Sequence, residues 1–289
     1  MIQRTFSFVR GIGPARQREL WRLGIRTWAD FPANGVVLSA ALDARIREAL
    51  PPMRSLVETR RYVELWARLP ARERWRLIPA LEGQAAYLDI ETAPDGRVTV
   101  IGVYDSARGV RLYVRGHNLG RFLSDLLPET VVTFNGLSFD VPVLRRTFPG
   151  WRPPPIHLDL CPITHQLDER GGLKAIEKRW GLGRPEHLEG VSGVDALGLW
   201  TAFALRRDSG ALRRLLEYNL YDVVQLRSLA QMACARLAER TGATWRPQVA
   251  FLRGDVLLDM TRAVDDVVSR ASSIVPDQIH DEERVPLRL

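Results

Sequence analysis

Residues 85–92 read Ala85-Ala86-Tyr87-Leu88-Asp89-Ile90-Glu91-Thr92, an apolar run that contains two acids. Side chains alternate between the two faces of a strand, so Asp89 and Glu91 are predicted to project to the same side. Two carboxylates held together repel each other unless a cation neutralises them, and hard oxygen ligands favour Mg²⁺ or Mn²⁺. The stretch therefore predicts a metal site on one face of a strand.

A second segment, around Asp140, follows a later apolar run of the chain. Residues 131–144 contain a strand that ends at Asn135 and a glycine turn, and Ser138 is expected to cap the helix that comes next. Pro142 fits the first turn of that helix. Asp140 would lie at the helix N-terminus, where the helix dipole favours a carboxylate and where open α/β sheets keep their ligands. A helix-start acid without a function is the alternative.

A third segment, residues 215–226, has strong helical periodicity. Tyr218 and Asp222 are four residues apart and share one helix face, so both can reach the same site. Asp222 can close a metal cage, and the Tyr218 hydroxyl can orient an attacking water. A tyrosine in a packing layer beside a solvated aspartate is the alternative.

The three segments together resemble the DEDD superfamily of DnaQ-like exonucleases, which have the ribonuclease H-like fold. The matching motifs are Asp89-x-Glu91, Asn135-Gly136-x-x-Phe139-Asp140 and Tyr218-x-x-x-Asp222. The tyrosine is typical of the DEDDy subgroup. The chain resembles the YprB-like exonucleases more closely still, over about residues 69–230. The segments that carry this resemblance are Leu69-Pro70-x-x-x-x-Trp75-Arg76, Ser138, His157-Leu158-Asp159-Leu160, Leu173-Lys174-x-x-Glu177 and Tyr218-Asn219-x-x-Asp222-Val223-Val224.

This resemblance implies a 3′→5′ exonuclease that hydrolyses phosphodiester bonds by a two-metal mechanism, and it suggests a role in DNA repair beside a helicase. Tyr218 would orient the nucleophile. Asn135 and Phe139 would shape the turn and contact the terminal nucleotide, with simple packing as the alternative. Four carboxylates are the implied ligands of two Mg²⁺ or Mn²⁺ ions: Asp89, Glu91, Asp140 and Asp222.

The order of elements favours an α/β domain, because strand-like runs come first and then alternate with helices. A basic, proline-bounded connector precedes them and places a domain boundary near residue 80. We predict a small all-α domain over residues 1–80, a ribonuclease H-like mixed sheet flanked by helices over 81–271, and a loosely ordered tail over 272–289. The expected strands are 85–90, 98–104, 110–114 and 130–134.

Residues 10–31 resemble helix-hairpin-helix modules, through Gly11-Ile12-Gly13-Pro14 before a short helix that Gly24 closes. Such modules bind the phosphate backbone through glycine turns and helix N-termini, so Gly11, Gly13 and Arg16 are candidate substrate contacts. A dinucleotide-binding loop is rejected, because Arg16 replaces the third glycine of that pattern. A packing module without a ligand is the alternative.

Thr27 is expected to cap the helix after Gly24. Residues 36–69 are predicted to be largely helical, with a break at Pro51-Pro52.

Positive charge is concentrated at the N-terminal end. Residues 1–80 hold 15 Arg and 7 acids, whereas residues 81–289 hold 26 basic and 27 acidic residues, for a net charge of +7. This asymmetry favours a nucleic-acid partner, and the helix-hairpin-helix resemblance favours DNA over RNA.

No membrane is expected as a partner, because no apolar run approaches about 18 residues. The N-terminus also lacks the apolar stretch of a signal peptide, so the expected location is the cytoplasm. Cys161 and Cys234 lie outside any CxxC pattern and are expected to be buried thiols.

Other residues have competing interpretations. Asp159 is a candidate spare ligand or a structural aspartate, and His165 and His187 have no partner at ligand spacing. The remaining candidates are substrate-path cations or solvated helix charges (Lys174, Arg179, Arg184) and base-stacking or core tryptophans (Trp151, Trp180, Trp200). For the whole chain, the alternatives are a non-catalytic nucleic-acid-binding protein on the same fold, a structure-directed endonuclease or an exoribonuclease. The presence of all four carboxylates and the tyrosine argues against a decayed site.

Overall fold

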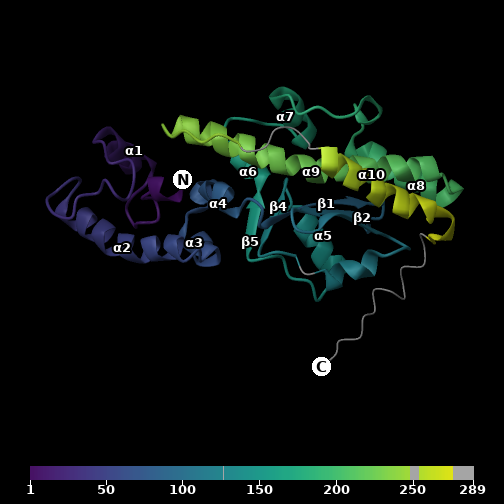
Figure 1. The fold of residues 1–289 in the computed structure, drawn as a ribbon, viewed down its shortest axis with the longest axis horizontal. Helices are drawn as coiled ribbons and strands as arrows, with labels where there is room; N and C mark the ends of the chain where they lie inside the picture. The colour runs from purple at the N-terminus through teal and green to yellow at the C-terminus, as the bar shows by residue number, and fades with distance from the viewer. Residues whose placement is uncertain (126, 248–253, 276–289) are drawn as a thin grey trace.

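A mixed β-sheet lies at the centre of the computed structural model, which describes residues 1–125, 127–247 and 254–275 (Figure 1). In these ranges five strands lie in the order β3-β2-β1-β4-β5. Their bounds are Ala85–Thr92 (β1), Val98–Asp105 (β2), Gly109–Val114 (β3), Thr130–Thr133 (β4) and Ile156–Asp159 (β5). Because β1 pairs antiparallel with β2 and parallel with β4, the prediction of an α/β fold with a mixed sheet is confirmed.

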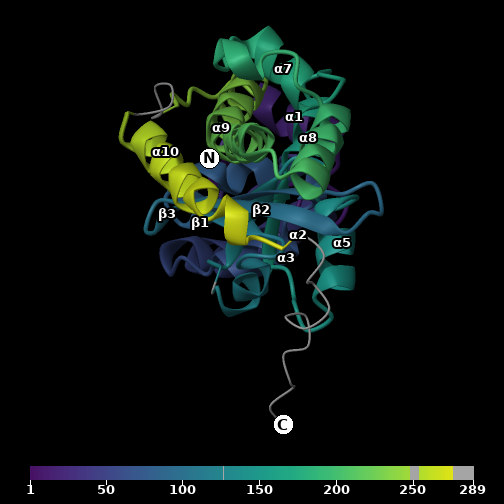
Figure 2. The same ribbon diagram turned by 90° about the vertical axis from the view of Figure 1, so that its right-hand side faces the viewer.

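Helices cover both faces of the sheet (Figures 1 and 2). The 32-residue helix α9 (Ser209–Arg240) crosses one face, with α8 (Gly193–Arg206) and α10 (Gly254–Ser269) beside it. Both views place α7 (Leu173–Trp180) on the side of α9 that faces away from the sheet. α5 (Asp140–Thr147) covers the opposite face. Shorter elements are η3 (Leu119–Ser124), α6 (Leu160–His165) and η4 (Glu186–Leu188).

Alternation along β1 separates two apolar clusters. Ala86, Leu88 and Ile90 pack with α5 and η3 on one face. Tyr87 joins the larger cluster around α9 on the other face. Asp89 and Glu91 share the parity of Tyr87, so the strand directs both carboxylates toward α9.

The N-terminal residues form a group of helices that packs directly on the sheet domain. Their bounds are Ile2–Arg4 (η1), Pro14–Arg22 (α1), Ala40–Glu58 (α2), Tyr62–Arg68 (α3), Ala71–Leu77 (η2) and Ile78–Leu81 (α4). Apolar side chains from these helices, including Leu77, Ile78 and Leu81, belong to the same buried cluster as the α9 side chains. The boundary predicted near residue 80 therefore falls within α4, where the core is shared.

The prediction that a helix begins after Thr27 is wrong. The Asp30 carboxylate accepts hydrogen bonds from the Thr27 backbone at 2.7 Å and its hydroxyl at 2.9 Å, which closes a turn instead. α2 starts later, where the Ser39 hydroxyl accepts from the Leu42 backbone N–H at 3.3 Å.

The break predicted at Pro51-Pro52 is also wrong, because α2 runs through both prolines. Both lie on the exposed side of the helix, where water can solvate the carbonyls that lose their N–H partners. Buried Ile46, Leu50 and Met53 hold the other side of α2 against the core.

At the other end of the chain, Ala271–Ser273 form η5 and Ile274 is buried. The rest of the predicted tail, residues 276–289, lies outside the described residues. Within the described ranges, no helix is both long and apolar enough to span a membrane.

Candidate metal centre

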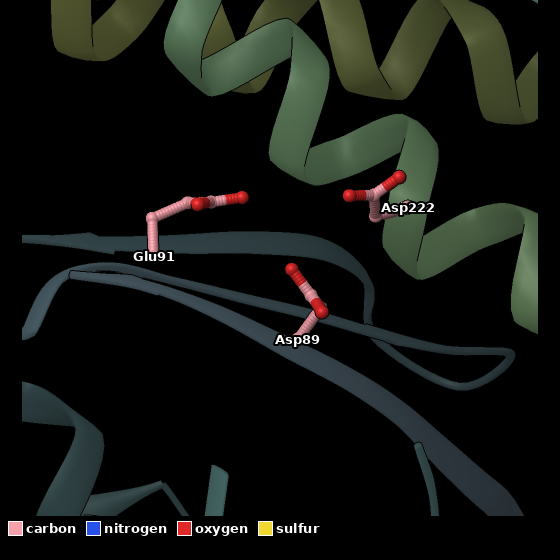
Figure 3. Close-up of side chains that lie close together, drawn as sticks. All are labelled: Asp89, Glu91 and Asp222. Atoms are coloured by element: carbon pink, nitrogen blue, oxygen red, sulfur yellow. The ribbon is translucent and has the colours of Figure 1, made fainter. Parts of the chain in front are cut away.

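Three carboxylates from β1 and α9 converge in the space between the sheet and the helix. Oxygens of Asp89, Glu91 and Asp222 all lie within 4.8 Å of one another. Figure 3 shows Asp89 and Glu91 rising from the sheet toward the helix that carries Asp222. The alternation predicted for residues 85–92 therefore produces the expected pair, and α9 adds the third acid.

Asp140 stands beside this group but outside it. It is buried at the start of α5, where the backbone of Ile90 partly offsets the rise that burial causes in its pKa. Its Oδ1 atom is buried and has no hydrogen-bond partner among the described residues. The negative charge of Asp140 still contributes to the raised pKa values of Asp89 and Glu91, so the four acids share one electrostatic environment.

Burial and mutual repulsion raise the pKa values of these acids. Burial is the largest cause at Asp89, whose pKa lies well above its usual value, and the charges of Asp222 and Asp140 add to the rise. Burial, followed by Asp222, raises the pKa of Glu91 to about 8. Burial raises that of Asp140 to about 7. Clustered, desolvated oxygens of this kind fit a hard divalent cation, which would relieve the repulsion and give Asp140 Oδ1 a partner.

Tyr218 shares the buried helix face of Asp222, as the four-residue spacing predicts. Burial raises the pKa of its hydroxyl above the usual value, and the charges of Asp222, Glu91 and Asp89 add to this. The hydroxyl is therefore protonated near pH 7 and can donate a hydrogen bond.

Comparison with protein families adds a second line of support for this domain. A model of the RNase H superfamily matches residues 86–234, which include most of β1, most of α9 and all four acids. The chain belongs to the RNase H superfamily. Neither the curated proteins nor the solved structures that were searched gave a match.

In this RNase H superfamily domain, Asn219 holds Asp89 in place. Its Nδ2 atom donates to Asp89 Oδ2 at 2.9 Å and to the Asp89 backbone oxygen at 3.3 Å. Gly102, the partner of Asp89 on β2, provides the space, because a Cβ there would lie 2.1 Å from Asn219 Oδ1. Asn219 belongs to the Tyr218 motif of the sequence, but the motif alone did not predict its contact with Asp89.

Asn219→Ala is expected to weaken divalent-metal affinity about 10- to 100-fold, the usual effect of removing a residue that orients a ligand. Titration calorimetry with Mn²⁺ measures this. Gln231→Ala is the matched control, because Gln231 is also a buried α9 amide and it hydrogen-bonds to Glu82, outside the cluster. Equal metal affinities of the two variants would contradict the positioning role.

Two cations approach Asp222 from the α7 side. Lys174 Nζ lies 3.3 Å from Asp222 Oδ2 and 4.2 Å from the centre of the Tyr218 ring. Arg184 hydrogen-bonds to Asp222 Oδ1 and, at 2.6 Å, to Glu177 Oε2. The interpretation of Lys174 and Arg184 as solvated helix charges is therefore wrong. Arg179 does not join them, because it pairs with Glu169 at 2.8 Å.

Asp159, the last residue of β5, supports the loop after β4. Its carboxylate accepts from the backbone N–H groups of Asn135 at 2.7 Å, Leu137 at 3.1 Å and Cys161 at 3.0 Å. These bonds hold Asn135 at a φ of +62°. The predicted Ser138 cap is wrong: Phe139 is the N-cap of α5, and no side-chain cap bond forms there among the described residues.

The same loop has an exposed apolar surface next to Asp140. Phe139 is 45% exposed and Leu137 is 55% exposed. Gly136 is required at the turn, because a Cβ there would lie 2.3 Å from Thr133 Oγ1. The contact predicted between Asn135, Phe139 and a terminal nucleotide stays a prediction.

The remaining candidates lie outside the acidic cluster. His165 Nε2 lies 3.6 Å from Cys161 Sγ, and His187 Nε2 lies 2.9 Å from Glu217 Oε2. Cys234 is buried as expected, whereas Cys161 is partly exposed. Trp180 and Trp200 are core residues, and Trp151 packs against the second apolar cluster.

The candidate substrate contacts of the N-terminal helices lie at the start of α1. Gly11 has a φ of +96°, and its carbonyl accepts from Arg16 Nη1 at 2.6 Å. Gly13 is the N-cap residue of α1. Contact of these residues with phosphates stays a prediction.

Proposed function

We propose that this protein is a metal-dependent nuclease that removes nucleotides from the 3′ end of DNA. The observation that carries the proposal is the convergence of Asp89, Glu91 and Asp222 within 4.8 Å, with buried Tyr218 on the same helix face as Asp222. Membership of the RNase H superfamily supports a nuclease in general. The 3′→5′ direction, the preference for DNA and a role in DNA repair beside a helicase rest on the DEDDy and helix-hairpin-helix resemblances.

The four acids would hold two Mg²⁺ or Mn²⁺ ions, which supply charge neutralisation and lower the pKa of water. Asn219 fixes the carboxylate of Asp89. The neutral Tyr218 hydroxyl orients the attacking water by a hydrogen bond. Lys174, beside Tyr218 and Asp222, offers a positive charge to the scissile phosphate. Exposed Phe139 and Leu137 offer apolar contacts to the sugar of the terminal nucleotide.

The proposal is tested with 3′-labelled and 5′-labelled oligonucleotides of DNA and RNA, in Mg²⁺, in Mn²⁺ and in chelator. We expect a 3′ label on DNA to be released at once as a mononucleotide, whereas a 5′ label remains on a ladder of shortening products. Internal fragments without terminal release would indicate an endonuclease, and faster degradation of RNA would indicate an exoribonuclease. Cleavage that persists in chelator would contradict the metal-dependent mechanism.

One observation favours a second candidate, a non-catalytic nucleic-acid clamp. Lys174 and Arg184 already contact the oxygens of Asp222, so the chain's own cations partly neutralise the cluster. A clamp would bind the oligonucleotides with unchanged length under every metal condition. The same assay therefore separates the two candidates.

The N-terminal helices are proposed to hold the polymer through their positive surface. Arg10, Arg18 and Arg22 are exposed on and before α1. Changing all three to Glu is expected to weaken DNA binding and to reduce the slope of log K against log salt by about 1 for each lost phosphate contact.

The control for this charge reversal changes Arg206, Arg214 and Arg262 to Glu. These three arginines are exposed on α8, α9 and α10, and their substitution changes the net charge equally. Fluorescence anisotropy at several salt concentrations measures both variants. Equal loss of binding in both would show that overall charge, and not the N-terminal surface, holds the DNA.

A further inference from the structure

A cavity of about 530 Å³ lies between α7 and the segment that leads to α8. It shares a wall with the candidate metal centre, because Lys174 and Arg184 both line the cavity and both contact Asp222. Its volume is in the range of small-molecule sites, about 300–1,000 Å³. The cavity is therefore placed to receive part of a substrate whose phosphate lies at the acidic cluster.

The walls of the cavity suit a flat ring that is attached to an anion. Leu182, Leu188 and Val191 supply apolar contacts. Glycines on the same segment leave open space, since a Cβ added at Gly183 or Gly190 meets no described atom within 4 Å. The cations Lys174, Lys178 and Arg184 line the same cavity. A nucleobase with its phosphate has this combination of an apolar face and negative charge.

Two buried polar atoms in the same wall have no partner. The side chains of Glu177 and Arg184 are 2% and 8% exposed, and they are paired with each other through Glu177 Oε2. Glu177 Oε1 and Arg184 Nη1 have no hydrogen-bond partner among the described residues. Unpaired buried groups are unfavourable, so a shift of this wall that turns Glu177 and Arg184 toward a ligand would give both atoms a partner. The edge of a nucleobase offers donors and acceptors side by side.

We propose that this cavity binds the nucleobase at the end of the substrate strand, with Arg184 and Glu177 at its edge and Leu182, Leu188 and Val191 against its faces. The proposal rests on the proposed nuclease function, because that function brings a strand end to Asp222. It assigns Arg184 a specificity role in addition to its contact with Asp222. A free nucleoside monophosphate has the same chemistry as a strand end, and the experiment separates these two sources.

Gly183→Leu is the test variant. Gly183 lies outside the left-handed φ region, and a side chain there projects into open space. The Gly183 carbonyl, which accepts from Gln225 Nε2 at 2.8 Å, is unchanged by the substitution. Gly150→Leu is the matched control, because Gly150 is likewise exposed, outside the left-handed region and without described atoms near an added Cβ.

Binding is measured by titration calorimetry in chelator, where hydrolysis does not interfere. The probes are deoxynucleoside monophosphates, a DNA trinucleotide, deoxyribose 5-phosphate and inorganic phosphate. We expect Gly183→Leu to weaken binding of the trinucleotide and the monophosphates at least about tenfold, equivalent to about 1.4 kcal/mol. Gly150→Leu should leave the affinity for both unchanged. In the wild-type protein, the trinucleotide should shift the amide resonances of residues 173–192, a measurement that needs no variant.

Equal binding to the two leucine variants, together with unshifted resonances over residues 173–192, would overturn the proposal. Deoxyribose 5-phosphate or phosphate binding as tightly as the nucleotides would show an anion site without base recognition, which also overturns it. If Gly183→Leu weakens binding of the monophosphates but not of the trinucleotide, the cavity is a site for free nucleotides and not for a strand end, which also overturns the proposal. None of these results bears on hydrolysis, which the labelled oligonucleotide assay tests separately.

Discussion

Asp89→Asn is expected to lower the rate of DNA hydrolysis at saturating Mg²⁺ by at least about 10²- to 10³-fold, the usual effect of removing one group that stabilises charge in a transition state. Asp89 belongs to the cluster in which oxygens of three acids lie within 4.8 Å of one another, and Asn219 fixes its carboxylate. Asparagine keeps the shape of the side chain and its hydrogen bond to Asn219, so the loss reports on charge. Rates on 3′-labelled DNA measure the effect.

The same substitution is expected to raise the melting temperature in chelator at pH 8. Burial raises the pKa of Asp89 well above its usual value, so the folded state carries a destabilising acid at this position. Asp125→Asn is the control, because the Asp125 carboxylate is held by Arg111 at 2.9 Å and lies outside the cluster. The control should keep full activity and lose stability. Full activity in Asp89→Asn would contradict the account.

Divalent metal is expected to stabilise the protein strongly at pH 8 and weakly at pH 5. The folded-state pKa of Glu91, about 8, exceeds its usual 4.5 because burial disfavours the charged form. The folded state therefore binds the proton more tightly than the unfolded state does. Without metal, the contribution of Glu91 to stability is most favourable below about pH 4.5, falls as the pH rises through this window, and is constant above about pH 8.

A bound cation would reverse this loss, because it stabilises the ionised carboxylates. We expect Mg²⁺ or Mn²⁺ to raise the melting temperature by about 5–10 °C at pH 8, since each kcal/mol corresponds to about 2–4 °C in a protein of this size. At pH 5 protons compete with the metal, and the rise should almost disappear. Differential scanning fluorimetry with and without chelator measures both. A metal effect of equal size at the two pH values would contradict the linkage.

Local rules predicted the parts of the site that lie within single elements. Strand alternation was sufficient to place Asp89 and Glu91 on one face, because the period of two leaves no other arrangement. Helical spacing was sufficient for Tyr218 and Asp222 on α9. Local patterns could not predict that β1 and α9 bring their acids together. That expectation came from the resemblance to a ribonuclease H-like family.

The remaining site contacts depend on tertiary packing that no local pattern encodes. Lys174 and Arg184 reach Asp222 across 48 and 38 residues of sequence, so no local pattern predicted their contacts with this carboxylate. Asp159 illustrates the same limit, because the backbone N–H groups that donate to its carboxylate lie 24 and 22 residues away in the sequence. At Thr27 the Asp30 carboxylate accepts from the backbone N–H, a bond that helix starts also make, so the local pattern did not distinguish a turn from a helix start.

The most direct test of the central claim is the anomalous scattering of Mn²⁺ in crystals of the wild-type protein. We predict two anomalous peaks in contact with the carboxylates of Asp89, Glu91 and Asp222, with Asp140 at one of them, and release of Arg184 from Asp222. Crystals of Asp89→Asn prepared in the same way should lose at least one peak. Manganese bound only elsewhere, or no peak between β1 and α9, would contradict the account.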